Sequence, residues 1–443
     1  MAQRHRLTTG TADRTLPLSG RRLTLPGSGA AAWHAARMLR WLGATVDSDA
    51  VADDASAAAD WAVSGALALT GRSDGPPLLP PGQAASAVRG ALLAIETLTA
   101  TRMPGPELLG ERAAIAGLRR NAPRSAGGAF RVLRAADGWV GVNLARPSDR
   151  ELVPAWLAEP DPVLDEAVAV RSVQELIDQG RLVGLPVAGL SEPDTKPVPF
   201  VLTGRAGEPS PWSPPLVVDL SALWAGPLCG HLLTLLGARV VKVESTHRPD
   251  GTRFGPRQFH DLLHAGQESV ALDFTSTAGR AALAGLVDAA DVVIEASRPR
   301  ALAQLGIDVK EVLARAGPKV WVSITAYGRT GRWSNAVGFG DDTAMAAGLL
   351  AVDPDTGTPA PCGDAIGDPV TGVNATLVAV ACRLAGGTWL ADLAMRDQVA
   401  ATMVGMPGPA PAALPPVARR PTGAAPDLGA DTARVLTELG LPC

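Results

Sequence analysis

The chain has 443 residues, of which 47% are hydrophobic and 19% charged, and its formal net charge is −4. This length allows two or three domains with large cores, and the composition excludes an intrinsically disordered chain. The small negative charge gives no electrostatic reason to expect binding to nucleic acid or an anionic membrane, and no apolar run is long enough to span a bilayer.

The first 126 residues hold two helical patterns. The N-terminus is polar and lacks the apolar stretch of a signal peptide. Segment 34–46 (HAARMLRWLGATV) has the form helix, glycine, strand, and segment 82–95 (GQAASAVRGALLAI) predicts a second helix.

The cysteines of the whole chain are scattered without CxxC spacing and there is no HExxH pair, so we expect a cytoplasmic protein with reduced thiols and no metal site.

Residues 127–200 differ in character and predict a small α+β domain. Two strands flank an Asp137-Gly138 turn, which is a strong hairpin signal. The run SVQELIDQGRLVGLPVAGL then predicts a helix followed by a strand.

Strands and helices alternate regularly from about residue 215. LVVDL is a buried strand, PLCGHLLTLLG a helix that ends at Gly237, and ARVVKVE the next strand. Further strands are expected at 269–274, 291–296 and 319–328, with helices at 279–290 and 310–317 between them. Such alternation predicts a Rossmann-like, doubly wound parallel sheet.

The end of the chain predicts a long helix over about 369–384 and a strand that runs into a helix over 388–404. Residues 406–428 are rich in Pro and Ala and predict an extended arm, and a short helix over 430–440 follows it.

Two segments of the first half resemble segments of the second. Residues 34–46 match the helix, glycine and strand around Gly237, and 82–95 match 367–380. We interpret this as an internal duplication whose first copy has lost most of the middle of the α/β unit. Chance similarity between Ala- and Leu-rich helices is the alternative.

The second half resembles the class III CoA-transferases, a group that includes carnitine CoA-transferase, formyl-CoA transferase and α-methylacyl-CoA racemase. The resemblance rests on ordered matches, namely VVDLSALWAGPLCGHLLTLLGARVVKVES, SVALDFTSTAGRAALAGLVDAADVVIEASRPR, VWVSITAYGRTG, GFGDDTAMAAGLLAV, GDPVTGVNATLVAV and DLGADTARVLTELGL. The segments DGWVGVNL and LVGLPVAGL resemble the small domain of that family.

The resemblance implies a particular domain organisation. Family members form interlocked dimers whose active site lies between the large domain of one subunit and the small domain of the other. Here the small domain (127–200) follows the partial copy (1–126) and precedes the complete large domain (201–405), with the arm and last helix at 406–443. We therefore expect a chain that resembles a fused, trimmed dimer with one complete active site. A further homodimer is left open.

Asp368 stands in GDPVTG, where the resemblance places the catalytic aspartate, while Gln83 stands at the matching place of the first copy. A carboxylate there can attack a thioester and carry CoA to a second carboxylic acid. It can also act as a base in an acyl-CoA isomerase, racemase or lyase. Racemase relatives pair this aspartate with a histidine, and the matching residue here is Phe339, which disfavours two-base chemistry. A helix N-cap is the structural alternative for Asp368.

The resemblance also implies a site for CoA, which would enter as a substrate together with a small carboxylic acid. Arginines near it, Arg248, Arg253, Arg298 and Arg300, are candidates for the phosphates. Two polar contacts usual in the family are replaced, so a non-catalytic CoA-ester-binding subunit is a further alternative. The positions implied to contact CoA are Leu223, Trp224, Ala225, Gly226, His264, Gln267, Ala296, Arg298, Phe339 and Gly340.

Four acidic residues near the active-site loop allow two interpretations. They are either solvated turn residues or a site that recognises a cationic or polar acyl group. These residues are Asp341, Asp342, Asp353 and Asp355.

Overall fold

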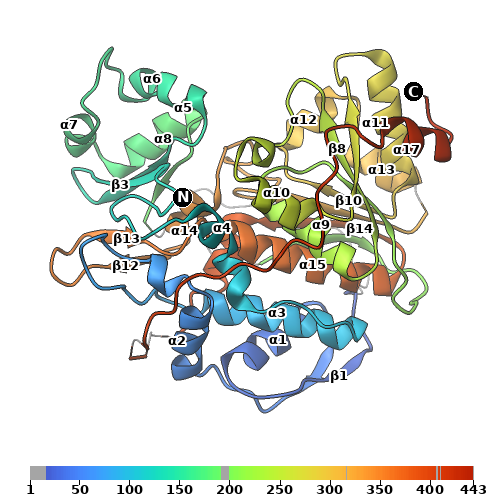
Figure 1. Ribbon diagram of the computed structural model, residues 1–443, viewed down its shortest axis with the longest axis horizontal. Coiled ribbons are helices and arrows are strands. Elements are labelled where there is room, and N and C mark those ends of the chain that lie inside the picture. The colour runs from blue at the N-terminus through green and yellow to red at the C-terminus, as the bar shows by residue number, and fades with distance from the viewer. Residues whose placement is uncertain (1–15, 191–198, 316, 406–407, 410, 443) are drawn as a thin grey trace.

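The computed structural model describes residues 16–190, 199–315, 317–405, 408–409 and 411–442. It has a mixed α/β fold whose centre is a seven-stranded sheet. Figure 1 shows the small domain above α14 (Gly340–Ala346), with the large sheet and its helices beside them. Below lie α1 (Ala30–Trp41), α2 (Asp54–Val63) and α3 (Ala84–Thr99).

The central sheet has the strand order β6-β14-β11-β10-β7-β8-β9. All neighbouring pairs are parallel except that β6 runs antiparallel to β14 at one edge. Read from β9, the parallel strands follow the 3-2-1-4-5-6 order of a Rossmann-type sheet, so the order reverses between β7 and β10. The strands are β6 (Val201–Arg205), β7 (Leu216–Asp219), β8 (Arg239–Ser245), β9 (Glu268–Leu272), β10 (Val292–Glu295), β11 (Lys319–Thr325) and β14 (Thr388–Ala394).

Helices cover both faces of this sheet because successive strand side chains point to opposite faces. Val217 packs in one core with α9 and α15, while Val218 packs in another with α11, α13 and α17. The helices are α9 (Ala225–Leu235), α10 (Arg257–His264), α11 (Thr277–Ala289), α12 (Pro299–Gln304), α13 (Val309–Arg315), α14 (Gly340–Ala346), α15 (Gly367–Ala385), α16 (Met395–Ala400) and α17 (Thr432–Glu438). A short antiparallel pair, β12 (Leu350–Val352) and β13 (Pro359–Pro361), joins α14 to α15.

The strands and helices expected from the alternation are confirmed, with boundaries shifted by a few residues. In the large domain the sequence did not predict α10, α12, α14, β12, β13 or the edge strand β6. The C-terminal arm has neither helix nor strand over 411–428.

The first half is a smaller α/β unit. Its two strands, β1 (Arg22–Thr24) and β2 (Thr45–Asp47), are parallel and are joined through α1 (Ala30–Trp41). Helix α3 (Ala84–Thr99) packs on α1, α15 packs on α9, and α3 packs on α15. The unit also contains α2 (Asp54–Val63) and α4 (Glu111–Ala116), with short 3-10 turns at Leu67–Leu69 and Pro106–Leu109.

Among its described residues, the small domain has a three-stranded antiparallel sheet and four short helices, of which α7 and α8 pack on the sheet. The hairpin around Asp137-Gly138 is confirmed, since β3 (Phe130–Arg134) pairs with β4 (Trp139–Asn143). The remaining elements are β5 (Val187–Gly189), α5 (Pro147–Glu151), α6 (Val153–Leu157), α7 (Leu164–Ala169) and α8 (Val173–Val183).

The C-terminal arm crosses the other parts of the molecule and is the red ribbon that passes α9 on its way to α17 in Figure 1. Arg419 on this arm donates to both carboxylate oxygens of the buried Glu111 in α4, at 2.6 and 3.0 Å. The same guanidinium lies 3.0 Å from Nε2 of His231 in α9. The arm therefore ties the first half to the large domain.

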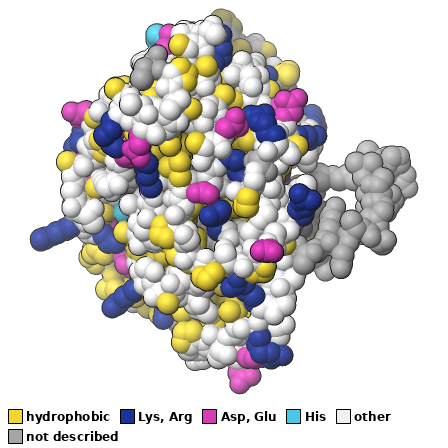
Figure 2. Space-filling view, turned by 90° about the vertical axis from the view of Figure 1, so that its right-hand side faces the viewer, with side chains coloured by type: hydrophobic (Ala, Val, Ile, Leu, Met, Phe, Trp, Pro, Cys, Tyr) yellow, Lys and Arg dark blue, Asp and Glu magenta, His cyan; other side chains and the backbone are white. Residues whose placement is uncertain are grey.

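On the face shown in Figure 2, side chains of both charges are interspersed among apolar ones. No helix among the described residues is long and apolar enough to cross a membrane.

Candidate active site

Asp368 lies in the first turn of α15. The helix begins at Gly367 with Ile366 as its N-cap residue, so the interpretation of Asp368 as the N-cap is wrong. Its Oδ2 instead accepts a hydrogen bond of 3.1 Å from the backbone N–H of Gly340, the first residue of α14. The side chain is partly exposed. Two helix starts therefore meet at this carboxylate.

Glycines allow α14 and α15 to approach so closely. A Cβ on Gly340 would overlap the carbonyl oxygen of Ala365 and lie 2.5 Å from Oδ2 of Asp368. A Cβ on Gly367 would lie 2.7 Å from Oγ1 of Thr343. The Gly340 N–H can reach Asp368 only because neither position carries a side chain.

Two acidic residues of α14 also maintain this junction. Asp341 accepts from the backbone N–H of Ala365 at 2.9 Å, and Asp342 accepts from that of Phe339 at 2.8 Å. Both side chains are buried, so the interpretation as solvated turns is wrong for them. It is also wrong for the buried Asp353, which forms an ion pair of 3.2 Å with Arg72, whereas Asp355 is exposed.

The carboxyls at the junction have unusual acidity. Burial raises the pKa of Asp368 to about 7; the Arg112 cation opposes this effect, and the neighbouring Asp341 adds to it. Burial likewise raises the pKa of Asp341 to about 6 and that of Asp342 to about 8. Near neutral pH, Asp368 is therefore divided between its protonated and ionised forms.

Arg112 of α4 brings the first half of the chain to this junction. Its Nε and Nη2 donate to the two oxygens of the fully buried Asp364 at 2.7 and 2.6 Å. Its guanidinium carbon also lies 5.0 Å from the ring centre of Trp224. Neither Arg112 nor Asp364 was a candidate from the sequence.

The loop implied to contact CoA lies between β7 and α9, beside the switch point of the sheet. Leu223 is exposed and has a left-handed backbone (φ 71°), whereas Trp224 and Ala225 are buried. Gly226 leaves room for Ser221, which a Cβ would overlap. The carbonyl of Ala225 faces α15, where a Cβ on Gly372 would lie 2.5 Å from it. Asp368, one turn before Gly372, therefore lies near this loop.

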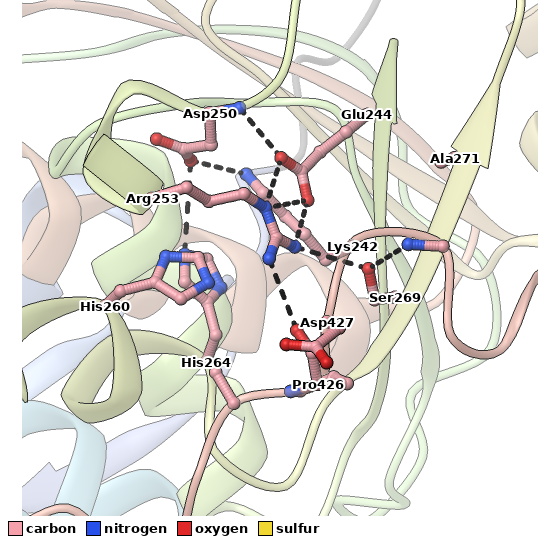
Figure 3. Close-up of polar contacts among 12 residues, drawn as sticks. Lys242, Glu244, Asp250, Arg253, His260, His264, Ser269, Ala271, Pro426 and Asp427 are labelled. Carbon is pink, nitrogen blue, oxygen red and sulfur yellow. Dashed lines mark hydrogen bonds and ion pairs between the residues drawn. The ribbon is translucent and has the colours of Figure 1, made fainter. Parts of the chain in front are cut away.

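A buried ionic network supports the same loop (Figure 3). Lys242 is 2% exposed; its Nζ contacts the carbonyl of Ser221 and lies 3.2 Å from Oδ2 of Asp250. Oδ1 of Asp250 accepts from the N–H of Leu223 at 3.0 Å. One ion pair thus holds both ends of segment 221–223.

His264 and Gln267 belong to this interior. Nδ1 of His264 lies 2.9 Å from Oε1 of Gln267, and both side chains are buried. Burial and the nearby Lys242 lower the pKa of His264 to about 3, so the ring is neutral. Both side chains therefore support the loop from the interior of the protein.

Ala296 and Arg298 lie after β10 and are exposed, as are Arg248 and Arg300. Burial, Arg300, Arg146 of the small domain and Arg248 lower the pKa of Arg298, so these cations share one region. Arg253 is different. It forms a bidentate pair with Glu244, with a shortest distance of 2.6 Å, and is therefore neutralised (Figure 3).

The small domain lies against the Asp368 side of the large domain. Strands β4 and β5 pack on α14, and the guanidinium carbon of Arg146 lies 5.9 Å from the ring centre of Phe339. Arg181 donates to the hydroxyl of Tyr327 at 2.6 Å, which ties α8 to the loop after β11. Of the expected contacts, Phe339 and Gly340 are therefore adjacent to both Asp368 and the small domain.

Gln83, at the place that matches Asp368, is buried and fully engaged. Its Nε2 donates to Asp54 at 2.9 Å, and its Oε1 lies 3.1 Å from Nε2 of His34.

Among the residues that the structure describes, no three His, Cys, Asp or Glu side chains gather in a way that could hold a metal ion. Cys229, Cys362 and Cys382 are buried free thiols, and Cys443 lies outside the described residues.

Comparison with known proteins identifies the large domain. Residues 215–432 match the model of CoA-transferase family III. These residues belong to that family. The resemblance inferred from the sequence is thereby confirmed, and the matched range contains Asp368 and the loop around Trp224.

Several curated CoA-transferases are similar to this chain. An acyl-CoA transferase of Fusarium pseudograminearum is 31% identical over 192 residues, which are 39% of this chain and 42% of that protein. The succinyl-CoA–D-citramalate CoA-transferase of Chloroflexus aurantiacus is 29% identical and covers 45% of this chain and 52% of its own length. A probable CoA-transferase of Mycobacterium tuberculosis is 25% identical over 401 residues, which are 66% of this chain and 50% of that protein. The chain thus spans about half the length of these relatives.

Among solved structures, a CAIB/BAIF family protein from Brucella suis is 28% identical, with a TM-score of 0.40 over 44% of this chain and 56% of that one.

Proposed function

We propose that this family III CoA-transferase chain moves CoA between an acyl-CoA and a small carboxylic acid, with Asp368 as the nucleophile. The observation that carries the proposal is the setting of Asp368 within the matched range. It is a partly exposed carboxylate whose Oδ2 is held by the Gly340 N–H, beside the loop of Trp224.

The chemistry follows from the carboxylate. The free oxygen of ionised Asp368 attacks the thioester carbon, the C–S bond breaks, and CoA thiolate leaves a mixed anhydride. The thiolate then attacks Cγ of Asp368 and releases the first acid. The carboxylate of the second acid attacks Cγ of the resulting aspartyl-CoA thioester, the C–S bond breaks, and a second mixed anhydride forms as CoA thiolate is expelled. The thiolate then attacks the acyl carbon of that anhydride, which gives the new acyl-CoA and releases the Asp368 carboxylate. The Gly340 N–H stabilises charge that develops on the oxygen it already contacts.

The exposed arginines near Arg298 support binding of the CoA phosphates. Arg248, Arg298 and Arg300 are exposed residues of the large domain, and the half-buried Arg146 of the small domain, which pairs with Asp149, adds positive charge beside them. A guanidinium pairs with phosphate through parallel hydrogen bonds. The grouping supplies positive charge in a chain in which two polar CoA contacts usual in the family are replaced, at Gln267 and Ala296.

We also propose that the chain arose by internal duplication and retains one active site. The β1–α1–β2 unit and the β7–α9–β8 unit share parallel pairing, and α3 packs on α1 as α15 packs on α9. The first copy offers Gln83 in a closed hydrogen-bonded setting instead of a free carboxylate. In this proposal the small domain closes the pocket that a second subunit closes elsewhere in the family.

A second candidate function has Asp368 as a general base on an acyl-CoA. Its pKa of about 7 favours this candidate, because a base is most effective when its pKa is near the working pH.

Trapping with hydroxylamine separates the candidates. The protein is incubated with succinyl-CoA and glutarate, or with other acyl-CoA and acid pairs, then treated with hydroxylamine and analysed by intact and peptide mass. Transfer through Asp368 predicts a hydroxamate on the Asp368 peptide that is absent in Asp368→Asn and retained in the exposed control Asp355→Asn. Solvent deuterium at the α-carbon without a hydroxamate would support the base instead. CoA binding with neither signal across the panel would overturn both.

A further inference from the structure

Arg112 is the link between the first half of the chain and the Asp368 site. It lies in α4, yet both of its hydrogen-bonded carboxylate oxygens belong to Asp364, four residues before Asp368. Asp364 is 0% exposed, whereas the Arg112 side chain is 33% exposed. The guanidinium therefore lies between a buried anion and the open side of the site.

The charges around Arg112 are unbalanced. Asp341 on α14, Asp364 before α15 and Asp368 on α15 are three carboxyls, and Arg112 is the cation that acts on both Asp341 and Asp368. Asp368 also accepts a hydrogen bond from the Gly340 N–H. Without Arg112, ionisation of Asp368 would place a charge next to other carboxylates without the cation that opposes their repulsion.

Arg112 also contacts the loop expected to bind CoA, since its guanidinium carbon is 5.0 Å from the Trp224 ring centre. A cation over an indole ring stabilises that ring's position. A single side chain thus connects the loop of Trp224 to the segment that carries Asp368.

We propose that Arg112, supplied by the first half of the chain, is a positioning residue that keeps Asp368 ionisable and holds the Trp224 loop beside it. The inference rests on the proposed function only in taking Asp368 as the reacting group. Arg112 lies outside residues 215–432, which the family model matches, so the proposal gives the first half of the chain a role at the site.

The ionisation of Asp368 can be measured without any substrate. Protein carrying ¹³Cγ-aspartate is titrated by NMR, and the Asp368 resonance is identified by its loss in Asp368→Asn. Arg112→Gln should raise the midpoint by roughly one to three pH units, because an opposite charge is removed. Asp364→Asn should lower it, because a like charge is removed and Arg112 is released.

Arg419→Gln is the matched control. Arg419 also forms a bidentate pair with a buried carboxylate, that of Glu111, and also joins the arm and large domain to the first half. It is not among the main charges that act on Asp368. Its loss should weaken the fold while leaving the Asp368 midpoint unchanged.

The outcomes are separable. An unchanged midpoint in folded Arg112→Gln, or equal shifts in Arg112→Gln and Arg419→Gln, would overturn the inference. If Arg112→Gln does not fold, Asp364→Asn decides, and a midpoint that fails to fall would overturn it. Shifted midpoints in a protein that forms no CoA adduct would uphold the role of Arg112 while removing the proposed transferase function.

Discussion

The backbone N–H of Gly340 lies 3.1 Å from Oδ2 of Asp368 and donates a hydrogen bond to it. The contact joins the starts of α14 and α15 and orients the carboxylate. It exists only because residue 340 has no side chain. The small domain packs on the same helix, so any displacement of α14 would also move the small domain relative to Asp368.

Gly340→Ala should therefore damage the site more than the fold. The added methyl would meet Ala365 and Asp368, and a displacement of about 1 Å at a reacting group can lower activity roughly 100-fold. Steady-state kinetics of CoA transfer checks this. Gly423→Ala is the control, because a Cβ there meets nothing within 4 Å. Equal activity of the two variants would show that the Gly340 contact does not position Asp368.

The rate of adduct formation should depend on pH through Asp368. The nucleophile must be ionised, and its pKa is raised from 3.8 to about 7 by burial. The rate should fall tenfold per unit below about pH 7, rather than below about pH 4 as for an ordinary carboxyl. Single-turnover trapping between pH 5 and 9 measures this. A flat profile down to pH 5 would show that Asp368 titrates normally.

Asp342 should make stability depend on pH. Burial raises its pKa from the ordinary 3.8 of an aspartic acid to about 8 in the folded protein, so the folded state binds the proton more tightly. The free energy of unfolding of the parent should therefore fall as pH rises from about 4 to about 8. Asp342→Asn keeps an oxygen that accepts from the Phe339 N–H but has no proton to lose. Between about pH 4 and pH 8, the free energy of unfolding of this variant should therefore rise relative to that of the parent by up to roughly 5 kcal/mol.

Urea unfolding of parent and variant at pH 5 and pH 8 tests this prediction. The exposed Asp355→Asn should show the same difference from the parent at both pH values. If Asp342→Asn behaves in the same way as that control, Asp342 is not protonated in the fold.

Hydrophobic periodicity was sufficient to predict the parallel strands and the longer helices between them, although it missed α10 and α12. LVVDL and DVVIEA are short buried runs that have no stable position except inside a covered sheet. The start of α14 was missed because GDDTAMA offers two acids and little apolar periodicity. Its stability comes from tertiary contacts, with Asp341 bonded to Ala365 and with β4 and β5 packed against it.

Asp368 could be chosen from the sequence only through a family resemblance, since the residue pattern alone favoured a helix N-cap. Arg112 could not be chosen at all. In ERAAIAGLRR it reads as one of several surface arginines, and its partner Asp364 lies 252 residues away in the chain. Pairing of that kind has no local signal, because it depends on how the two halves pack.

Two glycines in the helices beneath the site should respond oppositely to alanine. Gly372 on α15 faces the Ala225 carbonyl, 2.5 Å from where a Cβ would be, so Gly372→Ala should push α9 and α15 apart and destabilise the protein by roughly 1–3 kcal/mol. A Cβ on Gly230 of α9 would make only ordinary contacts of 3.5 Å or more. Gly230→Ala should therefore stabilise by up to about 1 kcal/mol through helix propensity. Thermal unfolding of both variants checks the pair, and the same sign of change in both would contradict the close packing.

The ion pair between Lys242 and Asp250 should control binding of CoA through the backbone of the loop. Asp250 accepts from the Leu223 N–H at 3.0 Å, and Leu223 is held at a φ of 71°, which costs a non-glycine residue about 1 kcal/mol or more. Asp250→Asn keeps the acceptor but removes the charge beside Lys242, so the loop should loosen. We expect a rise in KM for acyl-CoA of about tenfold with little change in kcat, since one buried charged hydrogen bond contributes on that scale.

The control for this prediction is Asp47→Asn, which removes an exposed ion pair with Arg22 and should change neither constant. Leu223→Gly in the Asp250→Asn background should restore part of the affinity if the left-handed backbone is what Asp250 maintains, because glycine adopts that conformation without strain. Calorimetric titration with CoA measures both effects. An unchanged affinity in folded Asp250→Asn would mean that the ion pair serves only the stability of the interior, and that the loop of Leu223 keeps its shape by packing alone.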